Sequence, residues 1–120
     1  MRHVPRLIQC LGDLWGFSPQ ETQRWWGAME HSRWSEATSL RRTLYYYNQL
    51  GPTPERSQHI LCSILTPQKT LALLENLCQE GVLARSDASQ IEEKVLGLID
   101  ATGRWVRLEI VDEVEIEVEH

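Results

Sequence analysis

Apolar residues recur at every third or fourth position along most of the chain, which is the spacing of one face of an α-helix. The pattern is clearest over residues 66–80. The apolar stripe of this segment consists of Leu71, Leu74, Leu77 and Cys78. Thr66 offers a hydroxyl that can cap the first turn, and Pro67 suits the first helical position. Gly81 suits the left-handed residue that follows many helices, so the sequence predicts a helix bounded at both ends.

A hydroxyl residue followed by proline marks three helix starts. These pairs are Ser18-Pro19, Thr53-Pro54 and Thr66-Pro67. After the first pair, Glu21 is placed to complete a capping box with Ser18. Together with the apolar periodicity, these signals predict six helices. We expect them at residues 4–15, from 19 to a break at 31–34, from a cap at Ser32 or Ser35 to 50, at 53–65, at 66–80, and from a cap at Asp87 to Gly103.

The period changes to two in the last part of the chain. Even positions carry Val106, Leu108, Ile110, Val114, Ile116 and Val118, and odd positions carry Arg107, Glu109, Glu115, Glu117 and Glu119. This alternation is typical of a β-strand with one buried face. We expect either a C-terminal hairpin with residues 111–113 as its loop or one long edge strand, and a short extended segment at residues 82–84. The sequence thus predicts a single mainly α domain of 120 residues with a C-terminal β-element.

Charge is distributed unevenly along the chain. Residues 1–85 hold nine Lys and Arg against seven Asp and Glu, which gives +2. Residues 86–120 hold three against ten, which gives −7, and the two parts add to the net charge of −5. A negative protein is not expected to attract nucleic acid as a whole, and its two parts can attract different partners.

The cysteines and the first residues indicate a cytoplasmic protein. Cys10, Cys62 and Cys78 are an odd, scattered set without CxxC spacing, which favours reduced thiols. Residues 1–5 lead into an amphipathic pattern and not into the apolar run of a signal peptide. We also expect no membrane-spanning segment.

Candidate catalytic chemistry is sparse. His59 and Cys62 share a helical face, but a structural zinc site needs about four ligands, so we predict no metal and no cofactor. The sequence contains no GxSxG motif and no glycine-rich phosphate loop. The acidic residues near the C-terminus alternate with apolar ones, as on a solvated sheet face. We therefore expect a protein that is not an enzyme.

Aromatic and arginine residues gather around residues 33–46. The candidate partner-binding residues are Trp34, Arg41, Arg42, Tyr45 and Tyr46. Trp, Tyr and Arg are the side chains that most often dominate protein interfaces, and aromatic rings can also stack single-stranded nucleic acid. Plain packing in the core explains the cluster equally well, so both interpretations stay open at this point. Elsewhere the aromatic rings fit the apolar stripes of their helices, and we expect core positions for Trp15, Trp25, Trp26 and Tyr47.

The segment from Thr53 to Glu80, followed by the residues 81–85, resembles the core of a winged helix-turn-helix domain. Two helices meet there at a tight turn, and a short extended segment follows. In that family the second helix enters the DNA major groove. The resemblance implies nucleic-acid-binding roles for Gln68, Lys69, Asn76 and Arg85. Glu75 and Glu80 lie on the same helix, and many members of the family bind proteins.

Two functions are consistent with these features. The first hypothesis is a non-enzymatic protein-interaction module, such as a small adaptor, assembly factor or regulator, with a homodimer through the C-terminal strand as one arrangement. The alternative is a winged helix-turn-helix transcriptional regulator that binds DNA.

Overall fold

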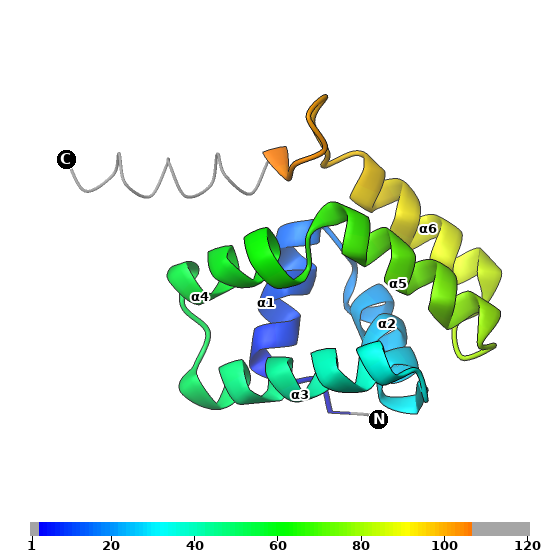
Figure 1. Ribbon diagram of the computed structural model, residues 1–120, viewed down its shortest axis with the longest axis horizontal. Coiled ribbons are helices and arrows are strands. Elements are labelled where there is room, and N and C mark those ends of the chain that lie inside the picture. The colour runs from blue at the N-terminus through cyan, green and yellow to red at the C-terminus, as the bar shows by residue number, and fades with distance from the viewer. Residues whose placement is uncertain (1–2, 107–120) are drawn as a thin grey trace.

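The computed structural model describes residues 3–106, and this part of the chain is an all-α globule (Figure 1). Its elements are α1 (Arg6–Trp15), α2 (Pro19–His31), α3 (Ser35–Leu50), α4 (Pro54–His59), the π-helical turn η1 (Ile60–Ile64), α5 (Pro67–Gln79) and α6 (Arg85–Leu96). The prediction of six helices is confirmed. The predicted C-terminal hairpin or strand, and the dimer through it, lie outside the described residues.

Helix α1 packs against α2 and α3 and also contacts α4, while α5 and α6 lie side by side (Figure 1). Helix α6 contacts α2 as well, which joins the two groups of helices. No helix in residues 3–106 is both long enough and apolar enough to cross a membrane.

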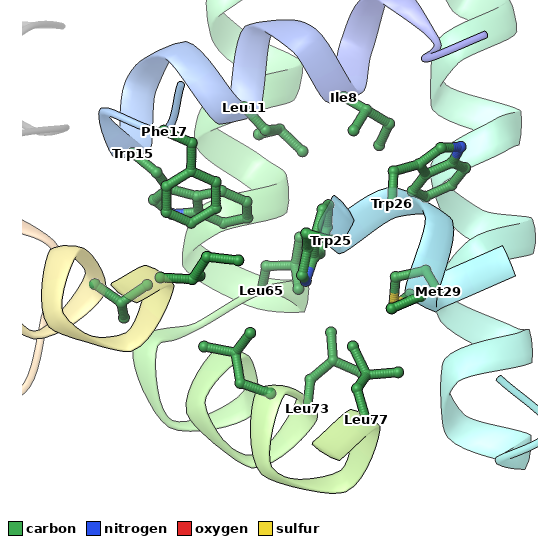
Figure 2. Close-up of a cluster of buried hydrophobic side chains, with 14 of the residues drawn as sticks. Ile8, Leu11, Trp15, Phe17, Trp25, Trp26, Met29, Leu65, Leu73 and Leu77 are labelled. Carbon is green, nitrogen blue, oxygen red and sulfur yellow. The ribbon is translucent and has the colours of Figure 1, made fainter. Parts of the chain in front are cut away.

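Tryptophans form the centre of the hydrophobic core. Figure 2 shows Trp25 in the middle of the cluster, among side chains from several helices. The ring of Trp15 contacts Trp25 edge-on, with centroids 5.5 Å apart, and also lies 6.1 Å from the ring of Trp105. Trp26 is fully buried. The core positions predicted for Trp15, Trp25 and Trp26 are therefore confirmed, and they explain much of the aromatic content.

The three hydroxyl–proline pairs start helices as predicted. Ser18 and Glu21 form a complete capping box. The Ser18 N–H donates to the Glu21 carboxylate at 2.8 Å, and the Glu21 N–H donates to the Ser18 hydroxyl at 3.1 Å. Thr53 and Thr66 accept the backbone N–H groups of Arg56 and Lys69. Each pair satisfies amides that a helix start would otherwise leave unpaired.

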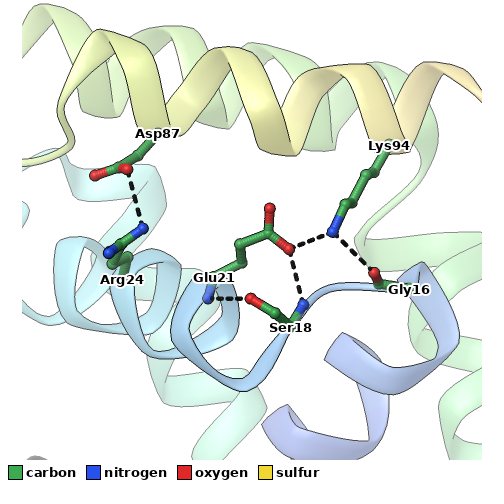
Figure 3. A network of polar contacts seen from close by, with 6 residues as sticks. All are labelled: Gly16, Ser18, Glu21, Arg24, Asp87 and Lys94. Atoms are coloured by element: carbon green, nitrogen blue, oxygen red, sulfur yellow. Dashed lines mark hydrogen bonds and ion pairs between the residues drawn. The ribbon is translucent and has the colours of Figure 1, made fainter.

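Two ion pairs fasten α6 to α2 (Figure 3). The Lys94 ammonium donates to the Glu21 carboxylate and to the carbonyl oxygen of Gly16, so it also closes the end of α1. Burial alone would raise the pKa of Glu21, but the hydrogen bonds from Lys94 and Ser18 lower it overall. The second pair joins Arg24 to Asp87 at 3.2 Å.

Two predicted caps are wrong because the side chains have partners elsewhere. Helix α3 begins after Trp34, which has no capping side chain, and the hydroxyl of Ser32 donates instead to the Glu80 carboxylate at 2.6 Å. Helix α6 begins at Arg85, two residues before Asp87. It also ends at Leu96, well before Gly103.

The helix predicted at residues 53–65 is regular only to His59. The next five residues form the π-helical turn η1, in which the Leu65 N–H reaches the Ile60 carbonyl at 2.6 Å. The buried indole N–H of Trp105 is shared between the carbonyl oxygens of Leu61 and Leu65, at 3.0 and 3.1 Å. The Trp105 indole, 40 residues from Leu65 in the sequence, therefore donates to carbonyl oxygens that lie where the α-helical hydrogen-bond pattern is interrupted.

Residues 82–84 are not extended, which corrects another prediction. After Gly81, whose φ is +80°, the N–H groups of Val82 and Leu83 both bond back to the Leu77 carbonyl. This turn closes α5 and leads directly into α6. Between residues 3 and 106 there is no strand, only an isolated bridge between Ile99 and Trp105. Of the features shared with winged helix-turn-helix domains, the described part therefore has the turn between α4 and α5 but lacks the short extended segment expected after α5.

Candidate functional site

Arg41 fastens α3 to α2. One of its guanidinium nitrogens donates to the carbonyl oxygens of Met29 and Glu30, at 2.8 and 2.9 Å. Carbonyls in the last turn of a helix have no partner within the helix, and an arginine commonly satisfies them. Arg41 therefore joins two helices of the protein itself.

Tyr45 is held on the same side of α3. Its ring meets Trp26 edge-on at 5.4 Å, and its hydroxyl donates to the Glu30 carboxylate at 2.9 Å. Burial and this bond to an anion both raise the pKa of Tyr45. Although 39% of Tyr45 is exposed, its polar end is bound within the protein.

Arg42 and Tyr46 face outward from α3. They are four residues apart and so lie next to each other on the helix surface. Tyr46 is 58% exposed and packs edge-on against Tyr47, with ring centroids 5.6 Å apart. The guanidinium of Arg42 has no hydrogen-bond or ion-pair partner within residues 3–106. Leu50, four positions after Tyr46, is 46% exposed and extends the apolar part of this face.

Trp34 lines a groove between α3 and the region of η1 and α5, which we call the α3–α5 groove. Its volume is about 340 Å³. The residues that line it are Trp34, Glu36, Ser39, Leu40, Thr43, Ser63, Ile64, Leu65, Lys69, Ala72 and Leu73. Positions 39, 43, 46 and 50 share one face of α3, so the groove continues into the exposed face that carries Tyr46 and Leu50.

Glu80 holds the turn that places Trp34. Its two carboxylate oxygens accept the Ser32 hydroxyl and the Arg33 backbone N–H, at 2.6 and 2.5 Å. Both hydrogen bonds lower the pKa of Glu80, and the bond from the Arg33 backbone N–H has the larger effect. The end of α5 thus fixes one end of the groove. Nothing in the local sequence marks Glu80 for this role, because its partners are almost 50 residues away.

Opposite charges occur at the groove. Lys69 and Glu36 both line it. The Lys69 ammonium lies 3.5 Å from the Ser63 carbonyl, and no carboxylate of residues 3–106 is within ion-pair distance of it. Lys69 is therefore available to an acidic group that enters the groove.

The residues that the winged-helix resemblance selects are partly engaged in internal contacts. The side chain of Gln68 donates to the Gly103 carbonyl at 3.1 Å. Arg85 pairs with Glu75 at 2.9 Å, and the arginine lowers the pKa of that carboxyl. Asn76 is half-buried on α5, and Lys69 lies at the groove. Within the described part, these four residues do not form one continuous cationic face.

The thiols and histidines of the described residues do not gather into a site. Between residues 3 and 106, no group of three or more His, Cys, Asp or Glu side chains is placed to hold a metal ion. The His59 ring packs on Tyr47, with centroids 5.9 Å apart. Cys62 is exposed, and burial raises the pKa of the Cys78 thiol.

The five candidate partner-binding residues therefore divide into three groups. Arg41 and Tyr45 bind α2, Arg42 and Tyr46 face outward, and Trp34 lines the α3–α5 groove. Of the residues in η1, α5 and the link between them that form the other wall of the groove, the sequence analysis named only Lys69, and it did so for the DNA-binding alternative. Comparisons of the chain with protein-family models, with curated proteins and with solved structures found no match.

Proposed function

We propose that the protein is a non-enzymatic interaction module that docks another protein on one continuous surface. This docking surface comprises the α3–α5 groove and the outer face of α3 with Arg42, Tyr46 and Leu50. The observation that carries the proposal is the continuity of the apolar groove with exposed aromatic and aliphatic side chains on a single helix.

The composition of the docking surface matches that of protein interfaces. Tyr, Trp and Arg are enriched among residues that dominate binding energy, and such residues cluster near pockets that exclude water. At about 340 Å³, the groove is near the lower end of the roughly 300–1,000 Å³ typical of ligand pockets, which suits a few side chains of a partner. An amphipathic helix or extended segment with spaced apolar anchors would fit it. An adaptor, assembly factor or regulator would use such a surface.

Charge favours a protein partner over duplex DNA. Phosphate binding needs several cations, because each neutralised phosphate releases counterions. The outer part of α5 carries Lys69 together with Glu75 and Glu80, and Arg85 is paired with Glu75. A surface of balanced charge supports contact with a protein more than contact with a polyanion.

The test exploits two neighbouring arginines. Full-length protein is used to capture partners, with Tyr46→Ala and Arg42→Ala as test variants and Arg41→Met as the matched control. Loss of an interface hot spot costs about 1–2 kcal/mol, so the first two variants should retain roughly 5–30-fold less of the specific partner. Their melting temperatures should stay within about 2 °C of the wild type, since both side chains are exposed.

Arg41→Met should behave in the opposite way. It removes the hydrogen bonds to Met29 and Glu30 and should lower the stability by about 1–3 kcal/mol, while the partner is still captured below the melting temperature. If Tyr46→Ala and Arg42→Ala both keep the same partners at the same yield, the docking surface is not where we place it. Retention of duplex DNA at low salt, abolished by Lys69→Ala, would favour the DNA-binding alternative.

A further inference from the structure

The two charged residues of the α3–α5 groove lie toward opposite ends of it. Glu80, at the end of α5, holds the turn before α3 through the Arg33 N–H, so Glu36 in the first turn of α3 lies at this end. Lys69 is in the first turn of α5, about 16 Å from Glu80 along the helix axis. Its ammonium is 3.5 Å from the Ser63 carbonyl in η1. The helix rise places the two charges roughly 10 Å apart along the groove.

Both charges are available to a partner. The side chains of Lys69 and Glu36 are exposed, and neither forms an ion pair within residues 3–106. The ion pairs of the described part are Arg24–Asp87, Arg85–Glu75 and Lys94–Glu21. A partner that carries the opposite charges at the same spacing therefore gains two ion pairs without breaking one. Complementary charges of this kind select a partner and fix its orientation.

The part of the groove between the two charges is mainly apolar. Trp34, Leu40, Ile64 and Leu73 line it, and the first three are only half-buried. Apolar side chains of a partner would remove this surface from water, which favours binding. The groove therefore offers an acidic site, an apolar floor and a basic site in a fixed order.

Both walls of the groove are helical. Helix α3 forms one, and η1 and α5 form most of the other. The backbone N–H and C=O groups of such walls are engaged in helical hydrogen bonds, so the walls present side chains to an occupant. An extended peptide would bring unpaired backbone groups against an apolar floor, which is costly. A helix pairs its own backbone groups, and helices commonly bind in apolar grooves.

We propose that the groove takes an amphipathic helix of a partner protein with a defined order of side chains. An acidic residue meets Lys69, apolar residues lie three and four positions along, and a basic residue seven positions along meets Glu36. Residues seven apart share one face of a helix and lie about 10.5 Å apart, which matches the spacing of the two charges. The inference deepens the proposed function and rests on it, because it takes the groove to be part of the docking surface.

Selection from random peptides tests this order of side chains. The probe is a phage-displayed library of random peptides of about 16 residues, long enough for about four helical turns. It is selected on full-length protein. On the wild type, we expect enrichment of one acidic and one basic residue seven positions apart, with apolar residues between them. Lys69→Glu should enrich two basic residues at these positions, and Glu36→Lys should enrich two acidic ones.

Glu93→Lys is the matched control. Glu93 is exposed on α6 and lies outside the groove, and its replacement changes the net charge as Glu36→Lys does. This variant should enrich the same peptides as the wild type. The same sequence pattern on all four targets, or no enriched peptide on the wild type, would overturn the proposal.

Binding of one enriched peptide measures the size of the effect. A synthetic, fluorescent copy of a peptide enriched on the wild type is titrated by anisotropy. Lys69→Glu and Glu36→Lys should each weaken its binding roughly 5–10-fold at low salt, because attraction becomes repulsion, and the loss should shrink at high salt. A proline between the apolar pair and the basic residue should weaken binding more than about tenfold, since it breaks a helix. Unchanged binding of the proline peptide would rule out a helix.

A further variant separates this inference from the proposed function. Ala72 is exposed and lines the groove, so Ala72→Trp should fill the groove without changing its charge. Thermal melts check that the variant folds. If Ala72→Trp blocks the peptides and the captured partner while the charge reversals have no effect, the docking surface stands and the charged helix is wrong. If the partner is captured equally by Ala72→Trp, Tyr46→Ala and Arg42→Ala, the proposed function itself fails.

Discussion

Replacing Trp105 by phenylalanine should destabilise the protein mainly through lost hydrogen bonds. The indole N–H of Trp105 is buried and serves the carbonyl oxygens of Leu61 and Leu65 in and after the π-helical turn. A phenylalanine ring keeps most of the packing but leaves the Leu61 carbonyl without this donor, whereas the Leu65 carbonyl keeps a hydrogen bond from the Thr70 hydroxyl at 3.3 Å. Leaving a buried polar group unsatisfied costs about 1–3 kcal/mol.

Trp15→Phe is the matched control. Trp15 and Trp105 are 2% and 3% exposed, and their rings contact each other. The Trp15 indole N–H is also buried, but it has no hydrogen-bond partner within residues 3–106. Both substitutions remove similar ring volume, so the difference between them isolates the hydrogen bonds of Trp105.

The comparison is made by thermal and urea unfolding. An entropy of unfolding of about 2.1 cal/mol/K per residue gives roughly 4 °C for each kcal/mol in a chain of this length. Trp105→Phe should therefore melt about 4–12 °C below Trp15→Phe. Amide exchange at residues 60–65 should accelerate in Trp105→Phe alone. Equal melting temperatures for the two variants, with no change in exchange, would refute the role assigned to Trp105.

Two further predictions concern α1 and α2. Gly12→Ala should lower the stability by about 1–3 kcal/mol, because an added Cβ would lie 2.2 Å from the hydroxyl oxygen of the buried Thr22. This clash outweighs the gain of about 1 kcal/mol in helix propensity. The melting temperature of the double variant Gly12→Ala/Thr22→Ala should recover toward that of Thr22→Ala alone. The pKa of Glu21 is lowered in the folded state from its ordinary value of 4.5. The stability that comes from its ion pair with Lys94 is therefore fully present above pH 4.5 and is lost as the pH falls through the folded pKa. In thermal melts between pH 7 and pH 3, Lys94→Met should lose less stability on acidification than the wild type.

Local chemistry made the starts of three helices and the core tryptophans predictable. Ser18 with Pro19, Thr53 with Pro54 and Thr66 with Pro67 act within one helical turn, so the sequence contains both partners of each interaction. The spacing of apolar residues at every third or fourth position likewise predicted that Trp15, Trp25 and Trp26 lie on buried helix faces.

The features that sequence reasoning missed depend on distant partners. Ser32 does not cap α3 because its hydroxyl binds Glu80, and residues 60–64 form a π-helical turn with carbonyls satisfied by Trp105. Both contacts join residues more than 40 positions apart, and no local pattern contains them.

The candidate site was predictable only as a neighbourhood. Arg41 and Arg42 are adjacent and chemically identical in the sequence, yet one binds the end of α2 and the other faces outward. Which of them is engaged depends on how α3 lies across α2, and that arrangement follows from packing of the whole core. The groove likewise needs η1 and α5 as its second wall.

Mapping the partner's footprint tests the docking surface most directly. Amide hydrogen exchange of the full-length protein is measured with and without the captured partner. We predict protection at residues 34–50 and 63–73, the two walls of the docking surface. Protection confined to the exposed side of α6, with the α3–α5 groove unchanged, would contradict the account.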